Sequence, residues 1–488
     1  MSTQPSPLRT LADSISQAVT VIEDAYAAAN LSYPSLTGSF DPASPAETLL
    51  MRPDVAQAAQ LVSVGCRALD AAAGSPGIKT MRASVGYVGT AAFEVAVNGY
   101  VAEILRSKPA GMHVDEIAAV NGFDAAILAR VLRKLASAFV FVEVAPNVFA
   151  NNRLSSTLDT GKTVKEIKAN PVARFTGALG VASLISHATD INFKGAARLY
   201  EWLQDKNRGD GPEDAPVPRA FGTNLPLYVW LEQPGNEHRF ASFATAMNAR
   251  EDIQPPDAIL QGLDFSTLPT GTKVVDVGAG IGHFSLTIAK KYPNLHYVIQ
   301  DRAAVVEKAK AHWSEHLPSA SVEMIPHDFF QPQPAKEPGV FILNNILHNN
   351  GKSRCMTILK LLREAAGPQT KLLIGEQVRF MLFAPLLLCK LEIDLLKIAP
   401  YACPEPVSLE GASDIKGADK LQAPVSPLLA PGLADWPVSA DLVMLLNFNS
   451  EERTLGGFID LVSETGWKIV EAKTIPGGVD GYMVAVPV

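Results

Sequence analysis

The stretch KVVDVGAGIGHFSLTIAKKYPNLHYVIQD, residues 273–301, decides the fold of this chain. It begins with β-branched residues that predict a buried strand, passes through a glycine-rich turn into a helix, and closes with a second strand that ends at Asp301. In a βαβ unit of this kind the glycines let the backbone approach a ligand closely, and the carboxylate after the second strand can hold a ribose diol. The turn contains the candidate binding residues Asp276, Gly278, Gly280 and Gly282. The stretch therefore predicts a site for a nucleoside-containing ligand and leaves the choice of nucleoside open.

The composition of the 488 residues is that of a globular protein with more than one domain, since 47% of them are hydrophobic and 19% are charged. The formal net charge of −8 argues against a general nucleic-acid binder, because neutralising phosphates needs clustered lysine and arginine. We therefore expect no nucleic-acid partner.

The cysteines and the apolar segments indicate a cytoplasmic protein. The four cysteines show neither metal-ligand spacing nor a disulfide pattern, so reduced thiols are the simplest interpretation and no metal is expected. The first residues lack the apolar core of a secretory signal. The longest apolar run, residues 380–389, is shorter than the ~20 residues that a membrane span requires, so we expect no span.

Residues 1–94 are predicted to form a helical extension, in which a helix over residues 53–73 roughly follows a 3.6-residue period. Such an extension can pack against a second subunit or cap a site. A plain scaffold role is an equally simple interpretation.

Residues 95–165 have the outline of a winged helix, with two helices around a turn and a β-hairpin after them. The second helix, at 124–137, would be the one that reads DNA, yet it offers only Arg130, Arg133 and Lys134 among apolar residues. A DNA-binding regulator is one hypothesis. In an acidic chain with a separate nucleoside site, a structural or dimerising module is the better one.

Residues 166–255 are predicted to be a mostly helical linker that contributes to a substrate pocket. The helix over residues 238–250 places Phe240, Phe243 and Met247 on one face by their three- and four-residue spacing. Such a stripe is usually part of a core. Because it directly precedes the nucleoside-binding unit, it could equally wall a substrate pocket.

From residue 256 to residue 488, strands and helices alternate as in a doubly wound, Rossmann-like α/β sheet. After the first βαβ unit we expect strands at 322–325, 340–343, 371–374, 467–472 and 482–486, and helices at 352–366 and 454–465. A Pro- and Ala-rich stretch at about 380–440 interrupts this alternation. Uninterrupted loops longer than ~15 residues are uncommon in compact domains, so we predict an insertion or a lid there.

Ligands of open α/β sheets bind at the carboxyl ends of the strands, which selects a small set of side chains. Asp328 followed by Phe329 suits an adenine, because the carboxylate can accept the exocyclic amine and the ring can stack; an ordinary turn or helix cap is the alternative. His348 follows another strand, and Glu376 and Glu452 reach the same rim. A histidine can remove a proton from a hydroxyl near neutral pH, and flanking carboxylates can fix its tautomer and stabilise the imidazolium.

Several ordered motifs resemble those of the class I S-adenosylmethionine-dependent O-methyltransferases of the plant caffeate and fungal secondary-metabolite type. They are DVGAGIGHFS at 276–285, VIQD at 298–301, HDFF at 327–330, ILHNN at 346–350, LLIGEQ at 372–377 and EERT at 451–454. The resemblance covers roughly residues 95–488. It also accounts for the winged-helix outline, since that module dimerises in this family, and it therefore implies a homodimer.

The resemblance implies that S-adenosylmethionine is the cofactor and that the substrate is a small aromatic or polyketide compound with a free hydroxyl. The residues implied to hold the cofactor are Asp276, Gly278, Gly280 and Gly282 in the turn, Asp301 at the ribose, and Asp328 with Phe329 at the adenine. The residues implied for catalysis are His348 as the base with Glu376 and Glu452 beside it, and Met247 and Asn447 are similar to substrate-lining positions.

Three features depart from the family pattern. Asn349 and Asn350 stand where the family usually has Asp and Trp, and Asn344 stands where Lys or Arg is common near the cofactor. The segment at 380–440 is also longer than usual. Fungal members of this fold exist that keep the cofactor but catalyse pericyclic or dehydration reactions, in which the sulfonium would act as a fixed positive charge. A pericyclase or dehydratase that transfers no methyl group is therefore the alternative.

Overall fold

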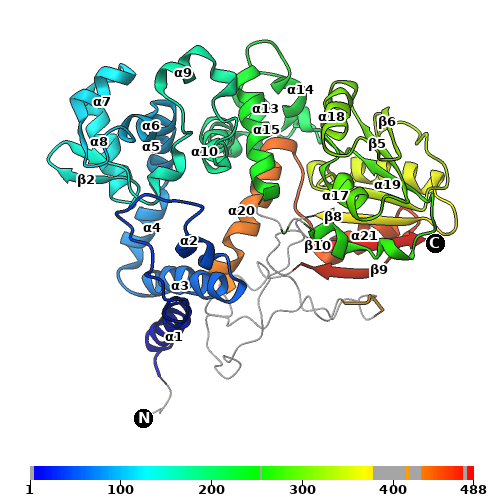
Figure 1. Ribbon diagram of the computed structural model, residues 1–488, viewed down its shortest axis with the longest axis horizontal. Coiled ribbons are helices and arrows are strands. Elements are labelled where there is room, and N and C mark those ends of the chain that lie inside the picture. Colours follow the sequence, from blue (N-terminus) through cyan, green and yellow to red (C-terminus); the bar gives the residue numbers. More distant parts are fainter. Residues whose placement is uncertain (1–4, 253–254, 256, 377–413, 418–429, 476–480) are drawn as a thin grey trace. The chain divides into compact units, whose positions relative to one another are not determined.

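Residues 273–301 fold as predicted into a strand, a helix and a second strand, which are β4 (Lys273–Val277), α17 (His283–Lys291) and β5 (His296–Asp301) (Figure 1). The computed structural model describes residues 5–252, 255, 257–376, 414–417, 430–475 and 481–488. The chain separates into two units, which are residues 1–207 with 216–252 and residues 208–215 with 253–488. Each unit has its own hydrophobic core.

The second unit is built on a seven-stranded sheet with the strand order β6-β5-β4-β7-β8-β10-β9. Its other strands are β6 (Val322–Pro326), β7 (Val340–Asn344), β8 (Lys371–Glu376), β9 (Trp467–Thr474) and β10 (Gly481–Pro487). The strands from β6 to β8 are parallel, and β10 pairs antiparallel with both β8 and β9. The chain order reverses between β4 and β7, and the carboxyl ends of the parallel strands meet at one edge, where ligands of such sheets bind. The predicted doubly wound α/β sheet and its strands are confirmed.

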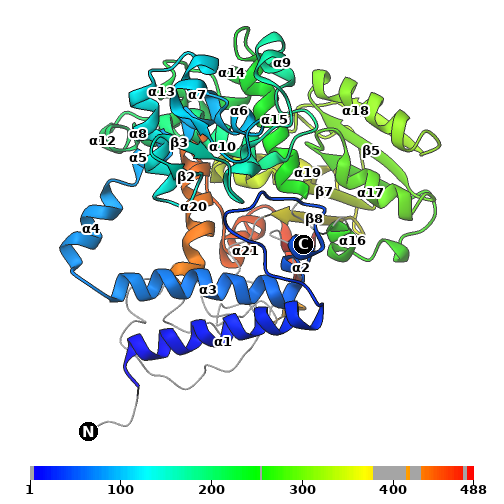
Figure 2. The same ribbon diagram turned by 60° about the vertical axis from the view of Figure 1, so that its left-hand side comes forward.

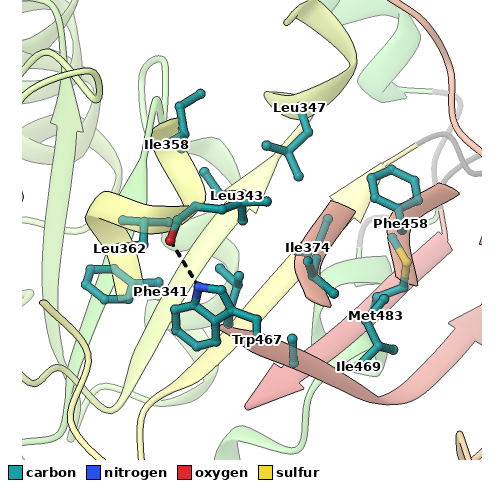
Figure 3. Close-up of a cluster of buried hydrophobic side chains, with 14 of the residues drawn as sticks. Phe341, Leu343, Leu347, Ile358, Leu362, Ile374, Phe458, Trp467, Ile469 and Met483 are labelled. Carbon is teal, nitrogen blue, oxygen red and sulfur yellow. Dashed lines mark hydrogen bonds between the residues drawn. The ribbon is translucent and has the colours of Figure 1, made fainter. Parts of the chain in front are cut away.

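Helices cover both faces of this sheet, because successive strand residues point to opposite sides. The helices are α16 (Ala258–Gly262), α17 and α18 (Ala303–His316) over one face, and α19 (Lys352–Ala365) and α21 (Leu455–Ser463) over the other. Val274 lies in the first of these cores and Val275 in the second. In the second core the indole N–H of Trp467 donates a hydrogen bond of 3.0 Å to the carbonyl of Leu359 (Figure 3), which fixes β9 against α19.

The predicted insertion at 380–440 lies largely outside the described residues. Its last part belongs to the helix α20 (Ala430–Phe448), a helix that the sequence analysis did not predict. Residues 414–417 lie along β9, where Lys416 forms a parallel bridge with Glu471 and its carbonyl accepts the N–H of Ala472 at 3.0 Å. These residues therefore extend the edge of the sheet.

The first unit is mostly helical, as predicted. Its N-terminal helices are α1 (Pro7–Ala28), α2 (Pro45–Leu50), α3 (Pro53–Ala72), α4 (Pro76–Ser84) and α5 (Tyr87–Asn98). Helices α1 and α3 lie side by side (Figure 2), with Tyr26 of α1 and Val55 of α3 in one buried cluster. The guanidinium of Arg153 donates two hydrogen bonds, of 2.7 and 2.5 Å, to the carboxylate of Glu47. This ion pair ties α2 to the remainder of the unit.

The helices and the hairpin predicted between residues 99 and 150 are present. They are α6 (Val101–Leu105), α7 (Val114–Asn121), α8 (Ala125–Ala136) and an antiparallel sheet of β1 (Met112–His113), β3 (Val148–Ala150) and β2 (Val142–Ala145), in that spatial order. Arg133 of α8 donates three hydrogen bonds to the carboxylate of Glu143 in β2. One cation of the candidate DNA-reading helix is therefore already neutralised, which weakens the DNA-binding hypothesis.

Short helices complete the first unit. They are α9 (Val164–Ala169), α10 (Gly180–His187), α11 (Phe193–Ala196), α12 (Leu199–Gln204), α13 (Pro216–Ala220), α14 (Leu227–Leu231) and α15 (Glu237–Asp252). A π-helical turn, Ala188–Asn192, joins α10 to α11. The predicted helix over residues 238–250 is α15, and Phe243 on it meets the ring of His187 edge-on at a centroid distance of 5.1 Å. In the described part of the chain, no helix is both long enough and apolar enough to cross a membrane.

Candidate active site

The glycine turn after β4 has a backbone conformation that suits glycine. Gly278, Gly280 and Gly282 have φ angles of 72°, 60° and 78°, a region in which residues with a Cβ atom are strained. A Cβ atom at Gly278 would lie 2.5 Å from Cδ1 of Ile346. One at Gly280 would meet no heavy atom of the described residues within 4 Å. The turn is therefore closely packed at Gly278 and opens onto free space at Gly280.

Asp301 closes this turn from the end of β5. One of its carboxylate oxygens accepts the backbone N–H of Gly280 at 2.8 Å, and the other accepts that of Arg302 at 2.7 Å. The structure thus brings the predicted acid directly against the predicted turn.

Asp276 lies beneath the turn and is only 3% exposed. Its carboxylate accepts the hydroxyl of Ser285 at 2.6 Å, which ties the first part of α17 to the end of β4. Burial, together with the nearby charge of Asp301, raises the pKa of Asp276 to about 7. Asp276 is placed to support the turn from below.

Phe329 and Asp328 follow β6 at the same edge of the sheet. Phe329 is half-buried, and its ring atom Cε1 lies 3.5 Å from the position that a Cβ atom of Gly278 would take. Asp328 is exposed, and its carboxylate accepts the backbone N–H of Phe330 at 3.0 Å, as in an ordinary turn. The aromatic ring therefore lies beside the glycine turn, while the carboxylate also shapes the loop.

His348, Glu376 and Glu452 come together at the carboxyl ends of β7 and β8, as the sequence predicted. Nδ1 of His348 lies 3.0 Å from Oε1 of Glu452 and 3.8 Å from Oε2 of Glu376. His348 is 4% exposed, Glu452 is 2% exposed and Glu376 is 0% exposed. Buried charges of this kind are retained only where they are paired, so the imidazole is held in a defined orientation between two carboxylates.

The loop of His348 is fixed by a second interaction of Glu376. Oε1 of Glu376 accepts the backbone N–H groups of Ile346 at 3.1 Å and Leu347 at 2.7 Å. Ile346 is also the residue whose side chain lies against Gly278. The glycine turn and the histidine loop are therefore joined through Ile346.

Three residues that the sequence analysis did not single out support this loop from the other side. The hydroxyl of Ser450 donates to the carbonyl of His348 at 2.5 Å. Arg453, only 4% exposed, donates to the carbonyls of Leu347 and Asn350. The carboxylate of Asp441 accepts the N–H of Glu452 at 2.8 Å. No spacing pattern marks these three residues, because the groups that they bond lie far away in the sequence or in the backbone.

Two of the three asparagines that depart from the family pattern, Asn349 and Asn350, form side-chain hydrogen bonds within the loop, whereas Asn344 forms none among the described residues. The amides of Asn349 and Asn350 donate to the carbonyls of Asn345 and Ile346, at 3.0 and 2.9 Å. Asn344 ends β7 and is 8% exposed, and neither its amide oxygen nor its amide nitrogen has a partner among the described residues. Asn349 and Asn350 therefore hold the loop together, while Asn344 retains hydrogen-bonding capacity at the rim.

The two expected substrate-lining residues lie in different units. Asn447 is on α20, which packs against the short 3₁₀ turn of His348, Leu347–Asn349; it is 2% exposed, and Oδ1 has no partner among the described residues. Met247 is on α15 of the first unit, where it is half-buried.

Comparison with known proteins supplies the family context of this site. A model of the O-methyltransferase domain family matches residues 198–382. The chain is also 37% identical to an O-methyltransferase of Armillaria gallica, in an alignment that covers 99% of this chain and 100% of that relative.

Two solved structures share the fold. One is a pericyclic reaction enzyme, with a TM-score of 0.62 and 18% identity over 91% of this chain and 98% of that chain. The other is the O-methyltransferase NcsB1 from neocarzinostatin biosynthesis in complex with S-adenosylmethionine and 2-hydroxy-5-methyl naphthoic acid, with a TM-score of 0.58 and 19% identity over 84% and 98%. At these identities the likeness shows the fold alone.

The buried carboxyl of Asp276 makes stability depend on pH. The pKa of Asp276 is raised to about 7 in the folded chain and is near 3.9 in the unfolded chain. Between these pH values the unfolded state binds fewer protons than the folded state. The free energy of unfolding therefore falls as pH rises from about 4 to about 7. The variant Asp276→Asn has no such group. Its free energy of unfolding, relative to that of the parent, should therefore rise by roughly 2–3 kcal/mol between pH 5 and pH 8. Urea unfolding at both pH values measures this change.

Asp264→Asn is the matched control. Hydrogen bonds from Ser266 lower the pKa of the exposed Asp264, so this group titrates below pH 5. The difference in free energy of unfolding between Asp264→Asn and the parent should therefore stay constant from pH 5 to pH 8. A constant difference between Asp276→Asn and the parent from pH 5 to pH 8 would contradict the assignment.

Proposed function

The chain belongs to the O-methyltransferase family and uses S-adenosylmethionine as its cofactor, and we propose that it methylates a hydroxyl of an aromatic or polyketide-type secondary metabolite with His348 as the general base. The observation that carries the assignment of the base is the buried contact of 3.0 Å between Nδ1 of His348 and Glu452, with Glu376 at 3.8 Å. A histidine oriented by carboxylates at the carboxyl ends of parallel strands is suited to proton transfer from a hydroxyl.

The imidazole acts through its other nitrogen. When Nδ1–H donates to Glu452, Nε2 retains its lone pair and takes the proton of the acceptor hydroxyl. The imidazolium that forms is stabilised by the carboxylates of Glu452 and Glu376. Bound S-adenosylmethionine supplies an electrophilic methyl group on its sulfonium. The chain positions the deprotonated oxygen and excludes water, which supports an in-line displacement.

The cofactor-binding residues of this proposal fit a nucleoside with a charged tail. The open space at Gly280 gives a ligand access to the backbone of the turn, and Gly278 and Gly282 complete that cradle. Asp301 would accept the ribose hydroxyls, and Phe329 with Asp328 would hold the adenine. Asp276 would hold the turn in place through the hydrogen bond that it accepts from the hydroxyl of Ser285.

The acceptor would be lined by Asn447 and Met247. The unpartnered amide oxygen of Asn447 supports a role in hydrogen bonding to a polar substituent. For Met247 the support is its adaptable thioether side chain and its position on α15 four residues after Phe243, the ring that meets His187.

The pericyclase or dehydratase alternative is not favoured. A relative whose alignment covers 99% of this chain is named an O-methyltransferase, and the likeness to a pericyclic reaction enzyme extends to the fold alone. Asn349 and Asn350, which had kept this alternative open, have hydrogen-bonding roles within the loop of His348.

The variant His348→Ala should lose methyl transfer by ~10² or more, because no other group would take the hydroxyl proton. Formation of S-adenosylhomocysteine with a panel of phenolic and polyketide acceptors measures the rate, and equilibrium binding of S-adenosylmethionine shows that the cofactor site is intact. His316→Ala, at an exposed position of α18, is the matched control. Transfer at the parental rate by His348→Ala would exclude His348 as the base.

Two adjacent glutamates provide a sharper comparison. Glu452 is buried against His348, whereas Glu451 is 54% exposed and pairs with Arg453. Glu452→Gln should lower kcat by about tenfold or more, since the imidazolium loses a charged partner, while Glu451→Gln should stay within about twofold. Equal effects of the two substitutions on kcat would show that Glu452 does not act on His348.

The same three residues could hold a metal ion, because one ligand atom from each lies within 4.8 Å of the others. We propose that they act without a metal, since Glu376 already accepts two backbone N–H groups and Nδ1 of His348 faces Glu452. Methyl transfer should therefore survive dialysis against EDTA unchanged. Loss of activity that Mg²⁺ or Zn²⁺ restores would assign a metal to this cluster.

The quaternary structure and location are further parts of the proposal. We propose a cytoplasmic homodimer assembled through the winged-helix-like module at 95–165, with the extension at 1–94, the linker at 166–255 and the catalytic domain at 256–488. Light scattering after size-exclusion chromatography should give twice the chain mass of 52.1 kDa. A mass of one chain at micromolar concentration would contradict the dimer.

A further inference from the structure

A cavity of about 350 Å³ lies wholly within the first unit. It is bordered by α5, α10, the first turns of α15 and the π-helical turn Ala188–Asn192. Ligand pockets in proteins span roughly 300–1,000 Å³, and single π-helical turns occur frequently at functional sites. Both the volume and the backbone therefore indicate a binding site rather than a packing defect.

The charged side chains that line this cavity include one cation more than carboxylates. The cations are those of Arg174, Lys194 and Arg239, and the carboxylates are those of Glu94 and Asp190. Asp190 pairs with Lys194 and accepts Nε–H of Arg239 at 2.7 Å, and Lys194 lies 3.3 Å from Glu94. Arg174 has its nearest carboxylate, Glu103, at 3.5 Å, outside the cavity lining. Among the described residues, Arg174 is thus the one cation of the lining whose carboxylate partner lies outside it, so no carboxylate stands between its guanidinium and the cavity lining.

His187 offers an unpartnered nitrogen at the same cavity. It is 7% exposed, and Nδ1 has no hydrogen-bond partner among the described residues. Burial lowers the pKa of His187 to about 4, so the ring is neutral at physiological pH and has one donor and one acceptor nitrogen. An unpartnered buried polar atom costs free energy that a bound ligand can recover.

The two arginines also retain donors. Nε of Arg174 is buried without a partner among the described residues. Arg239 donates to Asp190 and to the amide oxygen of Asn236, which uses two of its five N–H groups in the described part of the chain. The ring faces of Phe221 and Trp230, 5.4 and 5.6 Å away, restrain its guanidinium.

We propose that this cavity binds a small organic molecule through a carboxylate group, with Arg174 and Arg239 as the donors of charge-assisted hydrogen bonds and His187 as a neutral polar partner. Planar guanidinium groups match carboxylate geometry, and the unpartnered Nε of Arg174 and Nδ1 of His187 give such a group two buried polar atoms to contact. The inference goes beyond the proposed methyl transfer, because the cavity is bounded by the first unit alone.

Isothermal titration of the full chain with 4-hydroxybenzoate and with the neutral 4-hydroxybenzamide tests the carboxylate. The acid should bind, and the amide should bind at least about tenfold more weakly, since it lacks the charge that strengthens the hydrogen bonds. Equal affinity of the two compounds, or no binding of the acid up to millimolar concentration, would overturn the proposal. Binding is the readout here, so the result does not depend on whether the chain methylates either compound.

Substitutions locate the site. Arg239→Gln and His187→Leu should each weaken binding of 4-hydroxybenzoate, by about tenfold or more for the arginine. Arg52→Gln removes an arginine from an exposed pair with Asp54 in the same unit, and it should leave the affinity unchanged. Thermal unfolding shows whether each variant is folded. If folded Arg239→Gln and Arg52→Gln bind the acid equally well, the acid does not bind in this cavity.

Discussion

The candidate active site depends on the carboxylate of Glu376, which is fully buried at the end of β8. One of its oxygens accepts the backbone N–H groups of Ile346 and Leu347, and the other lies 3.8 Å from Nδ1 of His348. A buried carboxylate must be paired to be tolerated, so the fold has to present these donors in this arrangement. The same side chain therefore shapes the histidine loop and contributes to the field around the imidazole.

Close packing extends this constraint to the cofactor side. The backbone of Ile346 is held by Glu376, and its side chain lies where a Cβ atom of residue 278 would be, so the turn after β4 must have glycine there. The same glycine turn donates the N–H of Gly280 to the carboxylate of Asp301. A displacement of the histidine loop would accordingly move the glycine turn that is proposed to hold the cofactor. This coupling supports the close positioning of acceptor and cofactor as the main source of acceleration in the proposed reaction.

Much of the catalytic unit was predictable from the sequence because its signals are local. Periodic apolar runs and glycine-rich turns located the strands, and the carboxyl-end rule selected His348, Glu376 and Glu452. The supports of the loop were not predictable in this way. Ser450 and Arg453 bond to backbone carbonyls about a hundred residues away in sequence, and such contacts leave no spacing pattern. Helix α20 was missed, because the Pro- and Ala-rich composition of its first part resembles a loop.

The central claim is that His348 is held as the tautomer with hydrogen on Nδ1, leaving Nε2 to accept the substrate proton. Nitrogen NMR of the chain labelled only at its nine histidines measures this directly, with the His348 signal assigned by its loss in His348→Gln. If Nδ1–H donates to Glu452, the spectrum shows a proton on Nδ1 and a lone pair on Nε2 at neutral pH. A proton on Nε2 with a bare Nδ1 would contradict it.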